Sequence, residues 1–265
     1  MKLTVLGRYG PFPAPGGACS SYLVEGKNPA GDQQVRLLLD LGSGSLSRLL
    51  QVCPLGQINA IILSHLHSDH MSDMLVLRYA LQQLRAKGMD VPTPLTVIAP
   101  PQPELEFRML ASSGTFDMVA IQEGMKLRFG PLTVTFHRML HPVPTFAMDI
   151  EEEQPERPPM YGEEPIRKRL FYTGDTGMHA ALKTLCQKAA MLLADTCLLS
   201  NDKSGEFAPH LTAREAGQLA KEAGVGRLLC THVWGGGYTD AQILEEAREA
   251  FPPAEVVQEM GTYYI

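Results

Sequence analysis

The sequence lacks a cysteine motif, a long apolar run and an excess of basic charge, and each absence excludes a class of protein. Its five cysteines are scattered without a C-x-x-C pair, so we expect reduced, mostly buried thiols and no disulfide framework. No apolar run approaches the roughly 18 residues that a membrane-spanning helix needs, and the N-terminal run is too short for a signal peptide. We therefore expect no membrane partner and a cytoplasmic location.

Composition also excludes a disordered or strongly basic protein. Of the 265 residues, 45% are hydrophobic and 20% are charged, which is typical of a folded chain with a substantial core. The length allows one large domain or two small ones. The net charge of −6 disfavours a broad basic face for nucleic acid, although bound metal cations could make one face locally positive.

Short β-type runs alternate with helical patterns along the chain. We expect strands or extended segments at residues 3–6, 22–25, 35–40, 58–63, 95–99, 119–121, 126–129, 132–136, 169–173, 191–193, 227–231 and 256–264. We expect helices at residues 45–52, 71–87, 212–223 and 240–250. The runs between residues 119 and 136 predict a meander. The acidic, proline-containing segment 149–169 predicts a solvated loop or hairpin tip.

The ends of the third helix are clearly marked. Thr212 and Glu215 form the pattern of a capping box, and Gly224 follows the last helical residue. The sequence immediately before this helix is Pro209-His210-Leu211.

The strongest chemical signal is the segment Ser64-His65-Leu66-His67-Ser68-Asp69-His70, which follows a buried strand and precedes a helix. Two histidines spaced i, i+2 at a strand end point the same way, so His65 and His67 can share one cation. The turn into the helix can aim Asp69 and His70 at a second position nearby. A polar loop of hydrogen-bonded histidines is the alternative, but the density of imidazoles and carboxylates favours metal ligands.

Three further candidates lie where later strands give way to loops. They are His141, Asp175 and His232. Such strand ends are the usual place for site residues in layered α/β folds. Taken singly, each would more often be a capping or surface residue. Together with the first motif, they complete a set of metal ligands.

With these residues in view, the sequence resembles the metallo-β-lactamase superfamily. His65-x-His67-x-Asp69-His70 matches its metal-binding motif, and the three later candidates fall in the order of its remaining ligands. The resemblance covers essentially the whole chain and implies one domain over residues 1–265. The implied fold is a four-layer αβ/βα sandwich, in which two mixed β-sheets pack face to face with helices outside and metals at one edge.

The resemblance also assigns the metal ligands. It implies one metal held by His65, His67 and His141, a second held by Asp69, His70 and His232, and Asp175 as the bridge between them. Because this set mixes imidazoles with carboxylates and contains no cysteine, we expect two divalent ions, with zinc favoured over manganese or iron. Cys230, two residues before His232, is assigned to core packing.

The segment around His210 looks like the ribonuclease Z-like, phosphodiesterase-like branch of this superfamily. The resemblance implies that His210 faces the scissile phosphate and binds it or donates a proton; a loop histidine bonded to backbone is the alternative. Asp195 is the nearest match to the acid that supports this histidine in that branch, and a strand-end cap is its alternative reading. The branch's basic N-terminal loop and its flexible tRNA-gripping arm are both missing, which points to the smaller phosphodiesterase-like members.

We therefore expect a metal-dependent phosphodiesterase in which a hydroxide between two metals attacks the phosphodiester. Asp69 would orient this nucleophile, and His210 would donate to a phosphate oxygen or the leaving group. The substrate would be a small molecule or an RNA 3′ end, and the resemblance suggests a homodimer. The alternatives are a tRNA 3′-end processing endoribonuclease, a hydrolase of a lactone, β-lactam or thioester, and a metal-dependent binding module or sensor.

Overall fold

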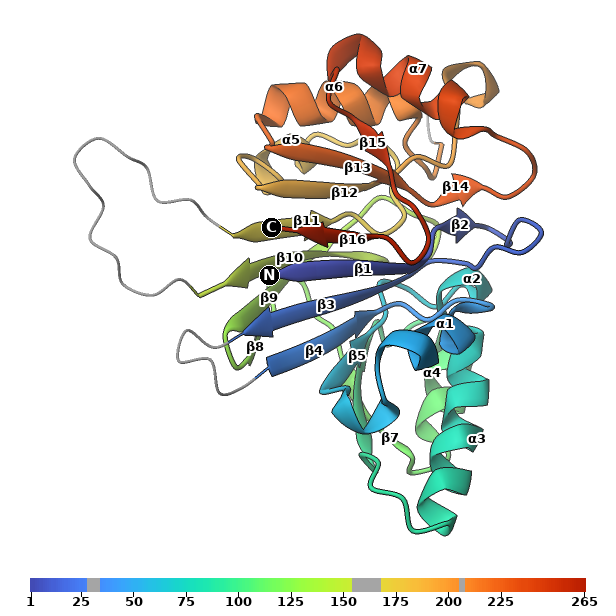
Figure 1. Ribbon diagram of the computed structural model, residues 1–265. Helices are drawn as coiled ribbons and strands as arrows, with labels where there is room; N and C mark the ends of the chain where they lie inside the picture. The colour runs from blue at the N-terminus through green and yellow to red at the C-terminus, as the bar shows by residue number, and fades with distance from the viewer. Residues whose placement is uncertain (28–33, 154–167, 205–207) are drawn as a thin grey trace.

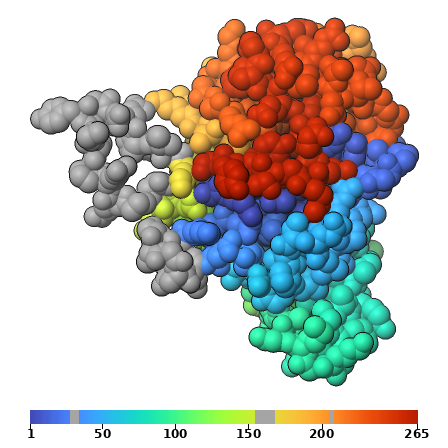
Figure 2. Space-filling view, in the orientation of Figure 1, coloured from blue at the N-terminus to red at the C-terminus, as the bar shows by residue number. Residues whose placement is uncertain are grey.

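The fold consists of two β-sheets packed face to face, with helices on their outer sides (Figure 1). A computed structural model describes residues 1–27, 34–153, 168–204 and 208–265. Both sheets are mixed, so the structure confirms the predicted four-layer αβ/βα sandwich. The two ends of the chain pair with each other as antiparallel strands, and Figure 2 shows the red C-terminal segment lying against the blue N-terminal one.

The first sheet comes mainly from the N-terminal half of the chain. Its strand order is β16 (Thr262–Tyr264), β1 (Lys2–Gly7), β3 (Ser21–Lys27), β4 (Gln34–Leu39), β5 (Ala60–Ile62), β6 (Leu95–Ala99) and β7 (Phe116–Ala120). The strands from β16 to β4 pair antiparallel, and those from β4 to β7 pair parallel.

The second sheet repeats this division between antiparallel and parallel strands. Its order is β15 (Glu255–Val256), β13 (Arg227–Thr231), β12 (Met191–Asp195), β11 (Arg169–Tyr172), β10 (Phe146–Glu152), β9 (Leu132–Arg138) and β8 (Lys126–Phe129). The strands from β8 to β11 pair antiparallel, and those from β11 to β15 pair parallel. A separate short ladder joins β2 (Tyr9–Gly10) to β14 (Val233–Trp234).

Helices cover the outer face of each sheet. The first sheet is covered by α1 (Ser45–Val52), α2 (Ser68–Met71), α3 (Asp73–Ala86) and α4 (Glu104–Ala111). The second is covered by α5 (Leu182–Leu185), α6 (Ala213–Ala223) and α7 (Asp240–Ala250). Two short 3₁₀ turns span Leu55–Gln57 and Ser200–Asp202. None of the helices in the described ranges is long and apolar enough to cross a bilayer.

The central strands are apolar on both faces because each strand is packed on both sides. In β4, Leu37 and Leu39 lie in the core between the sheets, whereas Leu38 packs under the helices of the first sheet. In β12, Leu193 faces the other sheet and Leu192 faces the helices. This arrangement explains the near-continuous hydrophobic runs of these strands, since buried parallel strands show no polar face.

The structure confirms most of the predicted elements. The helices expected at 45–52 and 240–250 and the strands expected at 95–99, 126–129 and 227–231 have the predicted bounds. The capping box joins Thr212 to Glu215, and Gly224 ends α6 in the left-handed conformation with φ 64°. The five cysteines are free and buried, as predicted.

Two predictions about secondary structure were wrong. The segment 119–121 does not form a meander with β8 and β9, because β7 pairs parallel to β6 in the other sheet. Residues 149–152 belong to β10 and not to a loop, while 154–167 lie outside the described residues. The helix expected at 71–87 is present as α3, and the short helix α2 precedes it. Helix α4 was not predicted, because Pro100, Pro101 and Pro103 before it suggested a loop.

Parallel strands bring their carboxyl ends to one edge of the sandwich. Residues that follow β4, β5, β11, β12 and β13 therefore meet there although they are far apart in sequence. The candidate metal ligands all belong to this edge or to the loop between β9 and β10.

Candidate metal centre

The His65–His70 segment (residues 65–70) runs from the end of β5 into α2. His67 has the extended backbone of a helix N-cap, so the chain turns there and directs Asp69 and His70 inward from α2. The carbonyl of Ser64 accepts a 3.0 Å hydrogen bond from the amide of Phe146, which ties this segment to the start of β10. His65 and His70 are fully buried, and His67 is half-buried.

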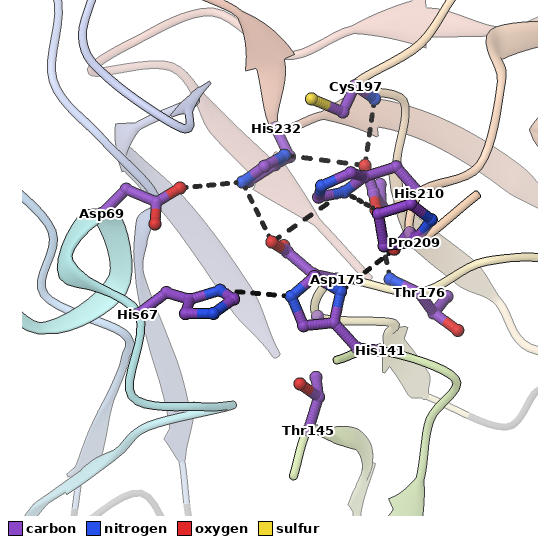
Figure 3. A network of polar contacts seen from close by, with 12 residues as sticks. His67, Asp69, His141, Thr145, Asp175, Thr176, Cys197, Pro209, His210 and His232 are labelled. Atoms are coloured by element: carbon purple, nitrogen blue, oxygen red, sulfur yellow. Dashed lines mark hydrogen bonds and ion pairs between the residues drawn. The ribbon is translucent and has the colours of Figure 1, made fainter. Parts of the chain in front are cut away.

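One cluster of potential ligands forms around the first two histidines. It consists of His65, His67, His141 and Asp175, each offering one ligand atom within 4.8 Å of the others. Nδ1 of His67 lies 3.0 Å from Nε2 of His65 and 3.2 Å from Nε2 of His141. Figure 3 shows His67 and His141 turned toward each other below Asp175.

A second cluster lies on the other side of Asp175. It consists of Asp69, His70, Asp175 and His232, with ligand atoms again within 4.8 Å. Nε2 of His232 lies 3.1 Å from Oδ2 of Asp69 and 3.3 Å from Oδ2 of Asp175. Nε2 of His70 lies 3.2 Å from Oδ1 of Asp175. The structure thus brings together all seven residues that the sequence predicted, in the two groups that the resemblance implied, with Asp175 in both.

The donor set fits divalent cations. Nε2 of His70 and Oδ1 of Asp175 are buried and, apart from their 3.2 Å ion-pair contact with each other, make no hydrogen bond of good geometry among the described residues. Leaving such atoms unsatisfied is unfavourable in a protein interior, and both atoms point into the second cluster. Imidazole nitrogens crowded to about hydrogen-bond distance, as in the first cluster, are the arrangement that a shared cation requires.

The electrostatic environment of the centre also favours binding of cations. Burial opposes ionisation of Asp175, yet the imidazoles of His232, His70 and His65 hold its pKa well below the usual value. Burial also opposes the charged form of His70, but the surrounding carboxylates, that of Asp175 first, raise its pKa well above the usual value. Burial lowers the pKa of His65, and the charge of His70 lowers it further. Divalent cations supply the charge that these carboxylates stabilise without protonating the imidazoles.

His210 lies beside both clusters. Its ring stacks on that of His232 with centroids 5.2 Å apart and meets His141 edge to face at 5.3 Å. Nδ1 of His210 is 2.9 Å from Oδ2 of Asp195, so this carboxylate holds the ring of His210. Burial opposes the charged form of His210, but Asp195 and Asp175 raise its pKa. Asp195 thus engages Nδ1 of His210 and not Nε2.

Asp40 is a residue of the centre that sequence reasoning missed. It follows β4, is fully buried, and its Oδ2 accepts hydrogen bonds from Ser64 Oγ at 2.9 Å and Tyr172 OH at 2.7 Å. Nδ1 of His70 lies 2.8 Å from the same oxygen, so Asp40 fixes the orientation of that ring. The sequence feature that could have indicated Asp40 is its position directly after the apolar run Leu37-Leu38-Leu39.

Strained backbone marks two positions of the centre. Asp40 and His232 both hold left-handed backbone, with φ of 57° and 54°. Residues other than glycine rarely adopt this conformation, and it is concentrated at functional sites where surrounding contacts impose it.

A cysteine also lies at the centre, but it is not the one considered from the sequence. Cys230 packs in the core between the second sheet and its helices, as predicted. Cys197 lies within 4.8 Å of ligand atoms of His210 and His232, and its amide donates a 2.9 Å hydrogen bond to Oδ1 of Asp195 (Figure 3). Burial raises the pKa of the Cys197 thiol.

Comparison with known proteins agrees with this geometry. A family model described as a beta-lactamase superfamily domain matches residues 36–233. The chain is similar to the probable metallo-hydrolase YhfI of Bacillus subtilis (strain 168), with 34% identity across 95% of this chain and 94% of that protein. It is also similar to ribonuclease Z of Brevibacillus brevis, with 26% identity across 85% and 86% of the two chains.

Solved structures with similar folds agree with these sequence comparisons. The crystal structure of the metallo-β-lactamase fold protein YhfI matches with a TM-score of 0.84 and 30% identity, covering 99% of this chain and 98% of that one. The crystal structure of a diphosphatase from the PhnP family matches with a TM-score of 0.71 and 15% identity, covering 100% and 97% of the two chains. This second likeness concerns the fold alone.

Proposed function

This chain belongs to the β-lactamase superfamily and has the metallo-β-lactamase fold, and from that premise we propose that it is a phosphodiesterase that binds two divalent cations. The observation that carries the proposal is the pair of ligand clusters sharing Asp175, with His210 beside both. His65, His67 and His141 would hold the first cation, and Asp69, His70 and His232 the second. We propose zinc for both positions on the ligand chemistry.

The bound cations would supply a water nucleophile at neutral pH and neutralise charge on the phosphoryl oxygens. Asp69 meets His232 and His70 through Oδ2, and we assign Oδ1 to accept a hydrogen bond from the attacking water. His210 would donate its Nδ1 proton to Asp195, and because Asp195 and Asp175 raise its pKa, we assign the imidazolium form, in which Nε2 carries a second proton toward the substrate. There it donates a hydrogen bond to a phosphate oxygen or a proton to the departing alkoxide.

A phosphodiester is favoured over a carbonyl substrate by the position of His210. A histidine held by a buried carboxylate beside both clusters supplies a proton donor that a phosphodiester with an alkoxide leaving group requires. Similarity to ribonuclease Z of Brevibacillus brevis supports the same substrate class.

The test is hydrolysis of bis(p-nitrophenyl) phosphate by protein reloaded with zinc, manganese or iron. We expect turnover that His67→Ala abolishes. His137 lies on β9, stacked on Phe171 away from both clusters, so His137→Ala serves as the matched control and should retain activity. No turnover with any of the three metals, or faster turnover of a lactone or nitrocefin, would overturn the proposal.

The second candidate is cleavage at the 3′ end of tRNA, which the ribonuclease Z similarity favours. It predicts tight tRNA binding that weakens steeply with added salt, because phosphate contacts release counterions. A net charge of −6 makes such binding less favourable than binding of a small phosphodiester.

A further inference from the structure

The two loops beside His232 are joined to each other by backbone hydrogen bonds. In the β2–β14 ladder, Val233 pairs with Tyr9 and Trp234 pairs with Gly10. The amide of Gly235 donates a 3.2 Å hydrogen bond to the carbonyl of Gly10. Figure 1 shows β2 and β14 next to each other, with the loop after β2 projecting from that side of the molecule.

This ladder lies directly against the metal centre. A Cβ atom on Gly10 would stand 1.9 Å from Nε2 of His232, so the backbone of Gly10 touches that ring. Paired residues of a parallel ladder present their side chains on the same face, so Trp234 is on the face that meets His232. Trp234 is also only two residues from His232, so their Cα atoms are at most about 7.6 Å apart.

Three aromatic side chains gather on these loops, and we call Phe12, Trp234 and Tyr238 the aromatic rim. Phe12 is 45% exposed and meets Trp234 edge to face, with centroids 5.5 Å apart. Trp234 and Tyr238 are 6.5 Å apart with an angle of 42° between their planes. An edge-to-face pair leaves the faces of one ring uncovered by the other.

Two contacts fix rings of the aromatic rim in place. A Cβ on Gly236 would stand 2.1 Å from Nε1 of Trp234, so backbone packs against the indole. The hydroxyl of Tyr238 donates to Oδ2 of Asp202 at 2.5 Å. Rings fixed in this way lose little conformational entropy when a ligand binds to them.

We propose that the aromatic rim is a subsite for a flat heteroaromatic ring, such as a nucleobase, carried on one ester arm of the phosphodiester; this rests on the proposed function. A phosphorus atom at the metal centre would direct its ester arms away from the ligands, and the ladder that carries the rim is in contact with one of these ligands, His232, through Gly10. Aromatic side chains bind flat rings by stacking, which every nucleobase allows because every base has a π-face. The rim thus selects a nucleoside phosphodiester over an alkyl one.

The chain contains one tryptophan, which makes the rim directly observable. Zinc-loaded protein is titrated with adenosine 5′-monophosphate and with ribose 5-phosphate, and Trp234 fluorescence is excited at a wavelength where adenine does not absorb. The two probes share the phosphate and the sugar and differ only in the base. We expect adenosine 5′-monophosphate to quench Trp234 and to bind about 5- to 150-fold more tightly, the range that one base stacked on an aromatic side chain provides.

Variants assign the preference to the rim. Phe12→Ala should remove most of the preference for the adenosine compound and leave the affinity for ribose 5-phosphate unchanged, and Phe12→Tyr should restore the preference. Trp234→Phe should abolish the fluorescence signal but retain stacking, measured by calorimetry. Tyr79 is 64% exposed on α3, so Tyr79→Ala is the matched control and should change neither affinity.

Equal affinity for the two probes would overturn the subsite, as would a base preference that Phe12→Ala leaves intact. Tighter binding of octyl phosphate than of adenosine 5′-monophosphate would show that the rim binds any apolar ester group, and this result would also overturn the proposed subsite. Hydrolysis of bis(p-nitrophenyl) phosphate is measured on the same samples. Turnover without base preference rejects the subsite alone, whereas absence of turnover rejects the proposed function whatever the probes do.

Discussion

Nδ1 of His210 lies 2.9 Å from Oδ2 of Asp195, and this contact joins the loop before α6 to the end of β12. Asp195 is fully buried, and the same carboxylate accepts hydrogen bonds from the amides of Cys197 at 2.9 Å and Thr176 at 3.1 Å. These amide contacts fix the carboxylate, and the carboxylate in turn fixes the ring. Asp195 fixes Nδ1 as a donor and helps to raise the pKa of His210, so the charged ring that it favours carries a second proton on Nε2 for the substrate.

The first prediction concerns this pair. Asp195→Asn should lower kcat for bis(p-nitrophenyl) phosphate by about 10- to 100-fold, because an amide neither favours the charged form of His210 nor fixes the orientation in which it donates to a phosphate oxygen. Zinc content, measured by mass spectrometry, should stay the same. The double variant Asp195→Asn/His210→Ala should be no slower than His210→Ala alone, since one residue acts through the other. Additive losses would show that Asp195 acts independently.

The second prediction concerns Asp40. Asp40→Asn places an amide donor either at Oδ2, opposite Tyr172, Ser64 Oγ and Nδ1 of His70, or at Oδ1, opposite the amide of Ser64, so it should lower the free energy of unfolding by about 3 kcal/mol. It should also weaken zinc binding about 10- to 100-fold through His70. Both are measured by chemical denaturation and by competition with a chelator.

Tyr172→Phe is the matched variant for Asp40. It removes one hydrogen bond to the same carboxylate and leaves His70 in place, so it should cost about 1.5–3 kcal/mol of unfolding free energy with unchanged zinc affinity. If both variants lost zinc equally, the role of Asp40 would be general packing and not orientation of His70.

The third prediction concerns the cysteines. Burial raises the pKa of Cys19 and Cys230 to about 12 and that of Cys186 to about 11. The thiolate is the reactive form, so near-neutral pH leaves almost none of it. The native protein should therefore react with less than one equivalent of Ellman's reagent, whereas the unfolded chain should react at all five. Rapid reaction of one thiol in the native protein would contradict this.

Elements with local signals could be predicted from sequence, and elements that depend on distant partners could not. The middle of β10 carries Asp149, whose charge suggests a loop. In the fold, Arg169 donates hydrogen bonds of 2.7 and 2.8 Å to its two carboxylate oxygens from the neighbouring strand, so the charge is compensated inside the sheet. Likewise, the alternation around 119–121 predicts a strand but contains no information about which sheet it joins.

The same division holds for the metal centre. The seven ligand candidates stand out because their residue types are unusual at strand ends, and the structure places them together. Asp40 was missed because a single acid after a strand is common, and its importance comes from His70 and Tyr172, which are distant in sequence. The contact of Gly10 with His232 is also invisible in sequence, since it depends on two loops meeting.

The fourth prediction tests that contact. Gly10→Ala adds a Cβ that would stand 1.9 Å from Nε2 of His232, and real Cβ atoms do not approach a ring so closely. Either the ring or the β2–β14 ladder must move, and His232 then no longer faces Asp69 and Asp175 as it does at 3.1 and 3.3 Å. We expect zinc content to fall from about two ions per chain to about one, since His65, His67 and His141 lie on other loops. The substitution displaces the ring of His232 and leaves the first cluster intact. If the Gly10→Ala variant kept two zinc ions with unchanged zinc affinity, binding of the second cation would not depend on His232.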